Sequence, residues 1–445
     1  MSTSDFRKYL MFASILLAGM AFAQTDPGPR GGAAGAGGPL AGLNANESAF
    51  FTAAKARFGE VDSVSGTVTG EAGVGLGPRF NGNSCAQCHV QPAVGGSSPI
   101  SVNPQVALAT LDGATNTVYP FIHSPGPVRE IRLINVPGTN TPDGGVHDLY
   151  TIKGRKDAGA CNAAQEDLQG QNLAGNAIAR IPTPTFGAGL VELTSDTTLQ
   201  ADANNANNAN FGISPQFNRS GNDGTITRFG WKAQNKSLLI FAGEAYNVEQ
   251  GVSNEAFPQE RDENPTCQFN PLPEDMTPLT NGNNSGSLSS DFSSDVVNFA
   301  AFMRLTAAPA PAPSTTSINN GRNDFIAIGC ALCHVQNHKT VPKANITAQS
   351  NVTYSPWSDF ATHNMGTGLF DGVTQGNAGT QHFRSAPLWG VGQRSFFLHD
   401  GRTNNLITAI EDHSSSGSEA NTAINNFNLL TAAQQQDVLN FLRSL

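Results

Sequence analysis

Two short cysteine and histidine motifs constrain this 445-residue chain more than any other feature of its sequence. Both have the pattern C-x-x-C-H: the first comprises Cys85, Cys88 and His89, and the second comprises Cys330, Cys333 and His334. Two thiols three positions apart can both reach the vinyl groups on one edge of a porphyrin, and the histidine that follows can bind the iron. The sequence therefore predicts two covalently bound c-type haems, with the two motif histidines as iron ligands.

Two other chemistries also use paired cysteines. Four thiolates can hold a structural zinc ion, but a zinc site leaves unexplained why a histidine directly follows each pair. A thioredoxin-like redox motif occurs beside a βαβ pattern, and this sequence has no such pattern. The haem interpretation accounts for every residue of both motifs, so we prefer it.

The first 23 residues have the features of a secretory signal peptide. Arg7 and Lys8 precede a short apolar stretch, and Ala21-Phe22-Ala23 offers small residues for cleavage. The stretch is too short to cross a bilayer comfortably, so we expect a periplasmic or otherwise exported chain with no transmembrane span after cleavage. The full chain has a formal charge of −10, and loss of this segment, which carries a net +1, leaves −11. This negative net charge argues against nucleic-acid binding and would attract a small basic electron carrier.

The composition predicts long irregular loops around a folded core. Gly occurs 47 times and Pro 26 times, and only 13% of residues are charged. The 26 Phe residues need a core in which to bury their rings, which argues against a disordered chain. In an oxidising compartment the two remaining cysteines, Cys161 and Cys267, are expected to form a disulfide.

The surroundings of the two motifs indicate a duplicated module. Phe80 to Gln91 reads FNGNSCAQCHVQ, and Phe325 to Gln336 reads FIAIGCALCHVQ. The sequence DVVNF at 295–299 is echoed by DVLNF at 437–441, and each echo opens an apolar helical run. Thr431 and Gln434 have capping-box spacing before the second run. A haem motif near the start and an amphipathic helix at the end is the layout of a small cytochrome c domain.

The fold class that follows is mostly α, with two cytochrome c-like domains, long irregular loops and a large insertion in the first domain. His89 and Asp295 lie 206 positions apart, whereas His334 and Asp437 lie 103 apart. Helical signals at 47–58 place Phe50, Phe51 and Phe58 against the first haem domain. The predicted segments are a signal peptide (1–23), a flexible Gly/Pro-rich N-terminus (24–43), the first domain (44–308), a Pro-rich linker (309–315) and the second domain (316–445).

Several longer strings resemble the di-haem oxidoreductases related to bacterial di-haem cytochrome c peroxidases. They are RFGWKA at 228–233, the stretch 184–192 ending in GLVE, HNMG at 363–366, PLWG at 387–390 and HDGR at 399–402. The resemblance spans most of the chain after residue 23. It implies that one haem is a six-coordinate electron relay and that the other is, or becomes, open to peroxide.

The family pattern also assigns the relay's second ligand. A methionine usually lies fourteen residues after the histidine of the H-x-G motif, and here that position, counted from His399, is His413. The resemblance therefore implies a relay haem bound by His334 and His413, whose potential should be low because Met ligation would raise it. Met365 in the HNMG string is the rival ligand, and an exposed, purely polar role for His413 remains open.

The same resemblance implies a catalytic set at the first haem. Trp231 matches the tryptophan that lies between the haems, whereas Trp357 and Trp389 are expected to be packing residues. Glu249 lies eighteen residues after Trp231, close to the family spacing for an acid-base glutamate, and Glu192 is the second candidate. The glutamine expected ten residues after Trp231 is instead Phe241. His123 and His147 are the candidate sixth ligands if this haem is not open.

Three functions remain open at this point. The first is a peroxidase that reduces hydrogen peroxide at the first haem, with electrons from a small donor such as a cytochrome or cupredoxin relayed through the second. The second is a purely electron-transferring cytochrome with both irons six-coordinate. The third is an oxidase acting on a thiol, a metal ion or a protein side chain. The resemblance further implies a calcium ion between the haem domains, with ligands that the sequence does not identify.

Overall fold

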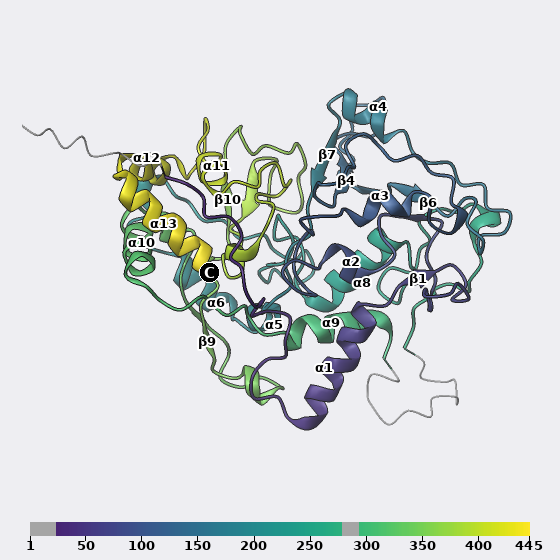
Figure 1. Ribbon diagram of the computed structural model, residues 1–445, viewed down its shortest axis with the longest axis horizontal. Coiled ribbons are helices and arrows are strands. Elements are labelled where there is room, and N and C mark those ends of the chain that lie inside the picture. Colours follow the sequence, from purple (N-terminus) through teal and green to yellow (C-terminus); the bar gives the residue numbers. More distant parts are fainter. Residues whose placement is uncertain (1–23, 278–292) are drawn as a thin grey trace, which may run out of the picture.

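The computed structural model describes residues 24–277 and 293–445, so the signal peptide expected at 1–23 lies outside the described residues (Figure 1). Regular structure is mainly helical and is joined by long loops, in agreement with the expectation of a mostly α fold. The helices are α1 (Ala45–Phe58), α2 (Cys85–Cys88), α3 (Pro104–Leu108), α4 (Leu168–Leu173), α5 (Ala188–Glu192), α6 (Asp196–Ala203), α7 (Asn208–Phe211), α8 (Leu238–Gln250), α9 (Asp295–Leu305), α10 (Thr316–Ala327), α11 (Leu406–Glu411), α12 (Asn421–Leu429) and α13 (Ala432–Ser444).

The strands are short and pair into small separate sheets. They are β1 (Asp62–Ser63), β2 (Gly73–Val74), β3 (Arg79–Phe80), β4 (Glu130–Leu133), β5 (Val146–His147), β6 (Tyr150–Thr151), β7 (Ala177–Arg180), β8 (His338–Lys339), β9 (Thr353–Tyr354), β10 (Thr362–Asn364) and β11 (His382–Arg384). Three of them form one antiparallel sheet in the order β5-β4-β7, with Ile131 opposite Ala179. This sheet belongs to the insertion and positions part of the first cavity described below.

Local side-chain bonds explain where the main helices begin. In α1 the Asn44 side chain accepts a hydrogen bond from the Glu47 backbone N–H, and the Asn44 backbone N–H donates to the Glu47 carboxylate. The same capping box joins Thr431 and Gln434 at the start of α13, which confirms the sequence prediction. Gly251 ends α8 with φ of 72°, a left-handed conformation that glycine adopts without strain.

Each haem motif lies beside a crossed pair of helices held by phenylalanines. In the first pair, Phe58 of α1 lies 4.6 Å from Phe302 of α9 between ring centroids, and 6.1 Å from the His89 ring. In the second pair, Phe325 of α10 lies 5.4 Å from Phe441 of α13 and 6.2 Å from the His334 ring. The long helices α10 and α13 lie side by side in Figure 1, as do α1 and α9. The two motifs are therefore surrounded alike, as a duplication predicts.

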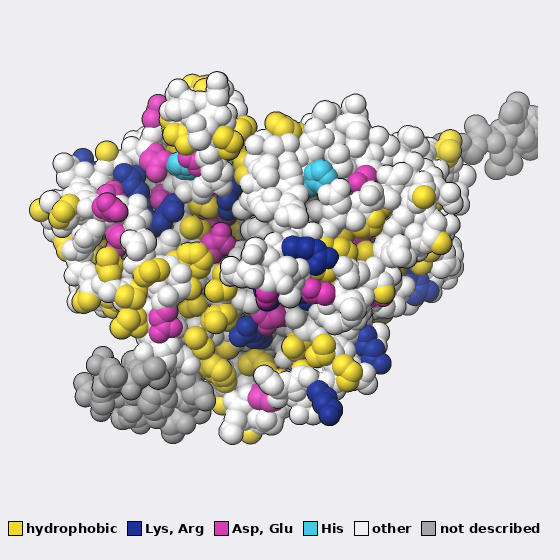
Figure 2. All heavy atoms as spheres, turned by 180° about the vertical axis from the view of Figure 1, so that it is seen from behind, with side chains coloured by type: hydrophobic (Ala, Val, Ile, Leu, Met, Phe, Trp, Pro, Cys, Tyr) yellow, Lys and Arg dark blue, Asp and Glu magenta, His cyan; other side chains and the backbone are white. Residues whose placement is uncertain are grey.

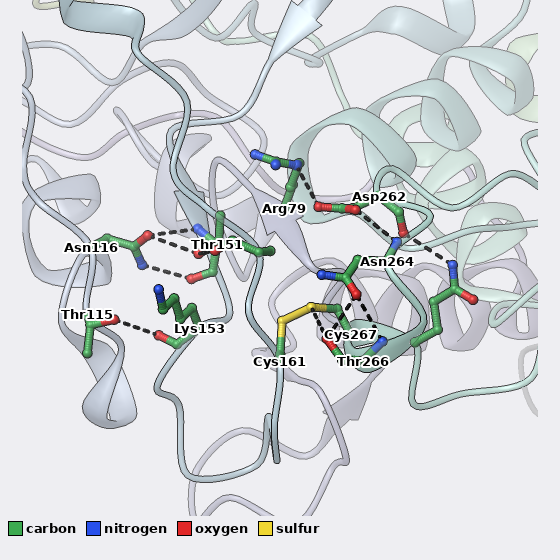
Figure 3. Close-up of a disulfide and its surroundings, with 12 residues drawn as sticks. Arg79, Thr115, Asn116, Thr151, Lys153, Cys161, Asp262, Asn264, Thr266 and Cys267 are labelled. Carbon is green, nitrogen blue, oxygen red and sulfur yellow. Dashed lines mark hydrogen bonds and ion pairs between the residues drawn. A yellow bond between two sulfur atoms is a disulfide. The ribbon is translucent and has the colours of Figure 1, made fainter.

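The insertion has a core of its own, closed by the predicted disulfide. Cys161 and Cys267 are bonded across a sequence separation of 106 residues (Figure 3). Cys267 belongs to a short 3-10 helix, Pro265–Cys267, whose preceding Asn264 accepts a hydrogen bond from the Thr266 N–H. Around the disulfide, buried apolar side chains form one cluster that includes Phe80, Leu149 and Tyr150. The disulfide therefore ties the returning chain to the insertion.

The segment 24–43, expected to be flexible, is docked along the C-terminal half. The Asp26 carboxylate bonds the Arg443 guanidinium at 2.7 Å and accepts a hydrogen bond from the Leu406 N–H, and Leu40 N–H donates to the Leu305 carbonyl. Burial opposes ionisation of Asp26, but its hydrogen bonds to Arg443, Leu406 and Gly28 hold its pKa below the usual value. Composition predicts the absence of helix here, but it carries no information about these distant partners.

The surface does not show a single dominant charge on the face drawn in Figure 2, where acidic, basic and apolar side chains are interspersed. Within residues 24–277 and 293–445, no helix is both long and apolar enough to cross a bilayer. The division of the chain at the Pro-rich linker remains a prediction. In the structure the linker is bonded on both sides, by Ala310 N–H to the Gly35 carbonyl and by Ala312 N–H to the Ser444 carbonyl.

Candidate functional site

The first C-x-x-C-H motif opens into a cavity of about 1150 Å³, including its mouth. Cys85 and Cys88 form the single turn α2, and His89 follows it, so all three side chains line the same cavity. The His89 Nδ1 lies 3.0 Å from the Gly96 carbonyl oxygen, which assigns the ring proton to Nδ1 and leaves the Nε2 lone pair available. Burial lowers the pKa of His89, so the ring is neutral, as a metal ligand must be.

The second motif opens into another cavity, of about 1300 Å³ including its mouth. Its lining is mainly apolar, but Cys330, Cys333 and His334 all face it. His334 Nδ1 lies 3.0 Å from the Trp357 carbonyl oxygen, so its Nε2 is also left available. Burial lowers the pKa of His334 to about 4.

The four motif cysteines fit haem attachment better than zinc binding. They are not disulfide-bonded, and the two pairs line different cavities, so they cannot surround one ion. Burial raises the pKa of Cys88 and Cys330 to about 12, so both are protonated thiols at neutral pH. Within the described part of the chain, no group of three or more His, Cys, Asp or Glu side chains is arranged to hold a metal ion.

His413 faces His334 across the second cavity. It follows α11, and its Nδ1 lies 2.7 Å from the Ala409 carbonyl oxygen, which leaves Nε2 available. Burial lowers its pKa, and its charge is among the influences that lower the pKa of His334. The structure therefore brings together the two imidazoles expected to bind the relay iron. The rival Met365 lines the same cavity and is buried.

His363 also lines the second cavity, but both of its nitrogens are occupied. Nε2 lies 3.0 Å from the Asp359 carboxylate and Nδ1 lies 2.9 Å from the Glu419 carboxylate. Burial disfavours its charge, but nearby Cys333 and Asp359 raise its pKa well above the usual value. A histidine held between two carboxylates has no nitrogen left for a metal.

Glu249, on α8, lines the first cavity and carries the most perturbed carboxyl there. Burial raises its pKa well above the usual value, and the neighbouring Glu130 carboxylate raises it further through charge and a hydrogen bond. Burial alone would also raise the pKa of Glu130, but Arg132 and Arg180 hold it below the usual value. These opposite shifts of pKa place a proton shared by the pair on Glu249 rather than on Glu130.

Glu192, the second candidate acid, lies outside both cavities. Its carboxylate bonds Arg304 at 2.6 Å and accepts a hydrogen bond from the Leu238 N–H at the start of α8. These contacts give it the role of a helix-capping ion-pair partner. Phe241, which stands where the family pattern has a glutamine, lines the first cavity. Gln234 lines it as well, so an amide is supplied from a different position of the chain.

Neither His123 nor His147 reaches the first cavity. His123 is exposed, with Nδ1 3.1 Å from the Pro125 carbonyl oxygen, and His147 lies between Glu166 and Asp143 at 2.8 and 3.1 Å. Among the described residues that line this cavity, Met303 of α9 is the one methionine. Met303 was not singled out from the sequence, because the run FMRL has the pattern of an ordinary buried helix. The signal that could have identified Met303 was its position in the final helix of the first copy of the duplicated module.

Trp231 lines both cavities and a smaller hollow of about 610 Å³ that lies between them. Its indole Nε1–H donates to the Ile181 carbonyl oxygen at 2.9 Å, and its own carbonyl accepts from the Arg384 N–H at 2.9 Å. The ring is thus fixed from both halves of the chain. Trp357 and Trp389 belong to hydrophobic clusters of the core, which agrees with their expected packing role.

A buried ion cluster beside Trp231 also joins the two halves. Asp371 bonds Arg180 at 2.7 Å and Lys232 at 3.1 Å, and the Lys232 Nζ donates to the Gly379 and His382 carbonyl oxygens. Burial lowers the pKa of Lys232 to about 8. The Lys232 ammonium therefore takes the central position among these carbonyl and carboxylate oxygens. The expected calcium ion has no ligand cluster among the described side chains and stays a prediction.

The chain matches the protein family described as "Di-haem oxidoreductase, putative peroxidase" over residues 142–445. A comparison with curated proteins found no match. Among solved structures, a hydrazine synthase of Kuenenia stuttgartiensis, pressurized with 20 bar xenon, is 16% identical with a TM-score of 0.23, covering 34% of this chain and 55% of that one.

A second solved structure, a MauG-like protein associated with microbial copper homeostasis, is 19% identical with a TM-score of 0.24. The match covers 36% of this chain and 55% of that chain. The chain therefore spans about half the length of both proteins. At these scores the two likenesses add nothing to the geometry described above.

Proposed function

Because the chain belongs to the family of di-haem oxidoreductases described as putative peroxidases, we propose that it is an exported di-haem c-type cytochrome that reduces hydrogen peroxide. One observation carries the proposal: two cavities, each with its own C-x-x-C-H motif, share the wall residue Trp231 but differ in lining. The second offers two neutral imidazoles, whereas the first offers one imidazole and a neutral carboxylic acid.

The difference in lining supports a division of labour. When bound, haem iron supplies the redox chemistry and a position for peroxide. In the second cavity His334 and His413 would each offer an imidazole nitrogen to the iron, which suits electron relay. In the first cavity His89 provides one, and the described lining contains no second histidine, so a position is left for a substrate.

Glu249 is the residue that we propose for proton transfer. Reduction of one peroxide to two waters consumes two electrons and two protons, and cleavage of the O–O bond is helped when a proton reaches the departing oxygen. A neutral Glu249 can give that proton from its carboxyl oxygen. The ionised Glu130 beside it, held by Arg132, can orient the acid. Both protons that the reaction consumes come from solvent, and uptake of a solvent proton by the Glu249–Glu130 pair returns Glu249 to its neutral form.

Trp231 supports transfer of electrons between the sites because its indole belongs to both walls. The electrons come from a donor outside the chain, for which a small cytochrome or cupredoxin attracted by the negative net charge is suited. Export, covalent attachment and the donor are parts of the same proposal. They rest on the sequence motifs and on the thiol state of the four cavity cysteines.

The proposal is tested by optical and electron paramagnetic resonance spectra of protein matured in a host that attaches c-type haem. We expect two added haem masses, one low-spin iron with bis-histidine signals, and one iron that binds cyanide and peroxide. Acid-acetone treatment that removed all pigment would overturn covalent attachment. Two low-spin irons that ignore cyanide in both redox states would overturn the peroxidase.

The rival function, a non-catalytic electron-transfer cytochrome, is favoured by one specific observation. Met303 lines the first cavity together with His89, and a thioether can complete a low-spin iron. Met303→Leu distinguishes the two functions. In a carrier the variant converts one iron to high spin and changes its potential, whereas in the peroxidase the spin state of the first iron stays as in the parent protein.

A further inference from the structure

Two arginines line the hollow between the cavities and also line the second cavity itself. Arg384 ends β11, and Arg394 follows the 3-10 helix Val391–Gln393. Both guanidinium groups belong to the lining of the hollow and of the cavity that contains Cys330, Cys333 and His334. The hollow is also lined by Trp231, which places the pair toward the first cavity. The arginines therefore stand where the second cavity faces its neighbour.

Neither arginine has an acidic partner among the residues that the structure describes. Arg384 donates from Nε to the Gly230 carbonyl oxygen at 2.9 Å and lies 5.9 Å from the Phe360 ring centroid. The buried Arg394 guanidinium makes no hydrogen bond or ion pair within the described chain. The other buried arginines of this region differ, because each bonds a carboxylate: Arg228–Asp196, Arg180–Asp371 and Arg443–Asp26.

Two guanidinium groups without an acidic partner lie near each other here, Arg394 buried and Arg384 half-buried, which is unfavourable for the protein alone. Burial lowers the pKa of Arg394 to about 10, and burial together with repulsion from Arg394 lowers the pKa of Arg384 to about 10. A buried charge is retained in proteins when an opposite charge satisfies it. Carboxylates are the anions that guanidinium groups bind with two parallel hydrogen bonds. The geometry therefore points to an anionic ligand at this end of the cavity.

We propose that Arg384 and Arg394 bind the two propionate carboxylates of the haem in the second cavity. This inference rests on the proposed attachment of that haem at Cys330 and Cys333. A haem brings two carboxylates to a cavity that is otherwise mainly apolar, which matches two guanidinium groups. The same cavity holds the carboxylate of Glu419, but that group is already bonded to His363 at 2.9 Å.

The pairing has a consequence for electron flow. Positive charge beside a haem favours the reduced, less positive state of the iron, so the arginines raise the potential of the second haem. They act as positioning and tuning residues, because they contact the carboxylates rather than the iron. Arg384 and Arg394 line the same hollow as Trp231. Their positive charge therefore lies on the side of the second haem from which electrons would leave toward the first cavity.

The direct test uses the unaltered holoprotein. Haem labelled with carbon-13 in its propionate carboxylates and protein labelled with nitrogen-15 in arginine are compared by oxidised-minus-reduced infrared spectroscopy. We expect ionised-carboxylate bands that shift with the first label and guanidinium bands that shift with the second. A redox spectrum that contains only protonated carboxyl bands, or no band sensitive to the arginine label, would overturn the inference.

The second test measures the midpoint potential of the haem bound by His334. It should fall in Arg384→Met and in Arg394→Met, fall further in the double variant, and return toward the parent value in Arg394→Lys. Arg219→Met is the matched control, because exposed Arg219 donates only to the Gly224 carbonyl and lies outside both cavities. Unchanged potentials in both Met variants, with both haems retained, would refute the pairing.

Two further outcomes are distinguishable. If no haem mass is attached at the second motif, the proposed function itself fails, whereas an attached haem with an unaltered potential in the variants defeats only this inference. If the arginines hold a free anion instead, the potential of the parent protein should change when phosphate replaces chloride at constant ionic strength. We expect no such change, and observing one would replace the propionates by a soluble anion.

Discussion

Trp231 and His399 lie edge to face, with ring centroids 6.5 Å apart, at the wall shared by the two cavities. His399 belongs to the HDGR string of the second half, and its backbone carbonyl accepts the Ile181 N–H at 2.9 Å. The Ile181 carbonyl in turn accepts the Trp231 indole N–H. One short chain of contacts therefore fixes the proposed electron bridge to both halves of the molecule, and it makes the bridge testable.

Replacing Trp231 with phenylalanine should slow peroxide turnover roughly tenfold or more, because the indole and its hydrogen bond to Ile181 are lost. The optical spectra of both haems should stay as in the parent protein. Rapid-mixing spectroscopy measures electron transfer between the haems directly. Trp389→Phe is the control, since it changes a tryptophan of the hollow that lines neither haem cavity. Equal rates in both variants would remove Trp231 from the electron path.

His413→Gly should convert the second haem from low spin to high spin, because one of the two proposed axial nitrogens is removed. Met365→Leu keeps an apolar side chain of similar volume in the same cavity and should leave the spectrum unchanged. Electron paramagnetic resonance of the oxidised protein distinguishes the two. The reverse pattern would assign the ligand to Met365.

Glu249→Gln should lower peroxide turnover by about 10²–10⁴-fold, because an amide cannot supply the proton. In the parent protein the pKa of Glu249 is raised by burial and by Glu130, so the proton is present at neutral pH and is lost as pH rises through that raised pKa. Turnover should therefore decline on the alkaline side. Glu192→Gln is the matched control, expected to retain turnover while unfolding about 0.5–1 kcal/mol more easily through its weakened pair with Arg304.

Asp26→Asn should destabilise the docked N-terminal segment by roughly 1.5–3 kcal/mol at neutral pH, because Arg443 loses a buried charged partner. The pKa of Asp26 is lowered in the folded protein. Its contribution is therefore fully present above the unfolded value of about 4 and is lost as pH falls through the lower folded value. Chemical unfolding at several pH values measures this. A stability difference that persisted in strong acid would show that the ion pair is not its cause.

Cys161→Ser with Cys267→Ser should lower the free energy of unfolding by about 2–5 kcal/mol, because the disulfide closes a loop of 106 residues in the unfolded chain. Thermal unfolding of the holoprotein measures the loss. The haem spectra are the control, since neither cysteine lines a haem cavity. An unchanged unfolding temperature would show that the insertion is held by its apolar cluster alone.

The features of this structure that the sequence predicted are mainly those whose residues lie close together along the chain. The C-x-x-C-H motifs, the capping box at Thr431 and the helix echo at 295–299 and 437–441 each depend on residues within a few turns of one another. The disulfide was expected because it used the cysteines that the motifs left over. Local chemistry determines the motifs, the capping box and the helix echo, whereas the disulfide joins cysteines 106 positions apart and was predicted only by elimination.

The parts that sequence missed depend on residues brought together from far along the chain. Glu130 and Arg132 reach the first cavity from a strand of the insertion, more than a hundred positions before Glu249. Their i, i+2 spacing would place them on one face of a strand, but nothing local shows which face meets the haem motif. Likewise, nothing near Arg384 or Arg394 in the sequence distinguishes them from other arginines, because their lack of carboxylate partners is a property of the tertiary structure.

The wall of the first cavity has a consequence for maturation. During the export that we propose, Cys85 and Cys88 leave the channel early, whereas Ile181, Glu249 and Met303, which line the same cavity, follow much later. An enzyme that links the cofactor to these thiols therefore meets an accessible chain only until helix α9 has been delivered and packed. We expect loading to precede closure, so a chain that folds too quickly in a host with slow haem supply would remain permanently colourless at this site.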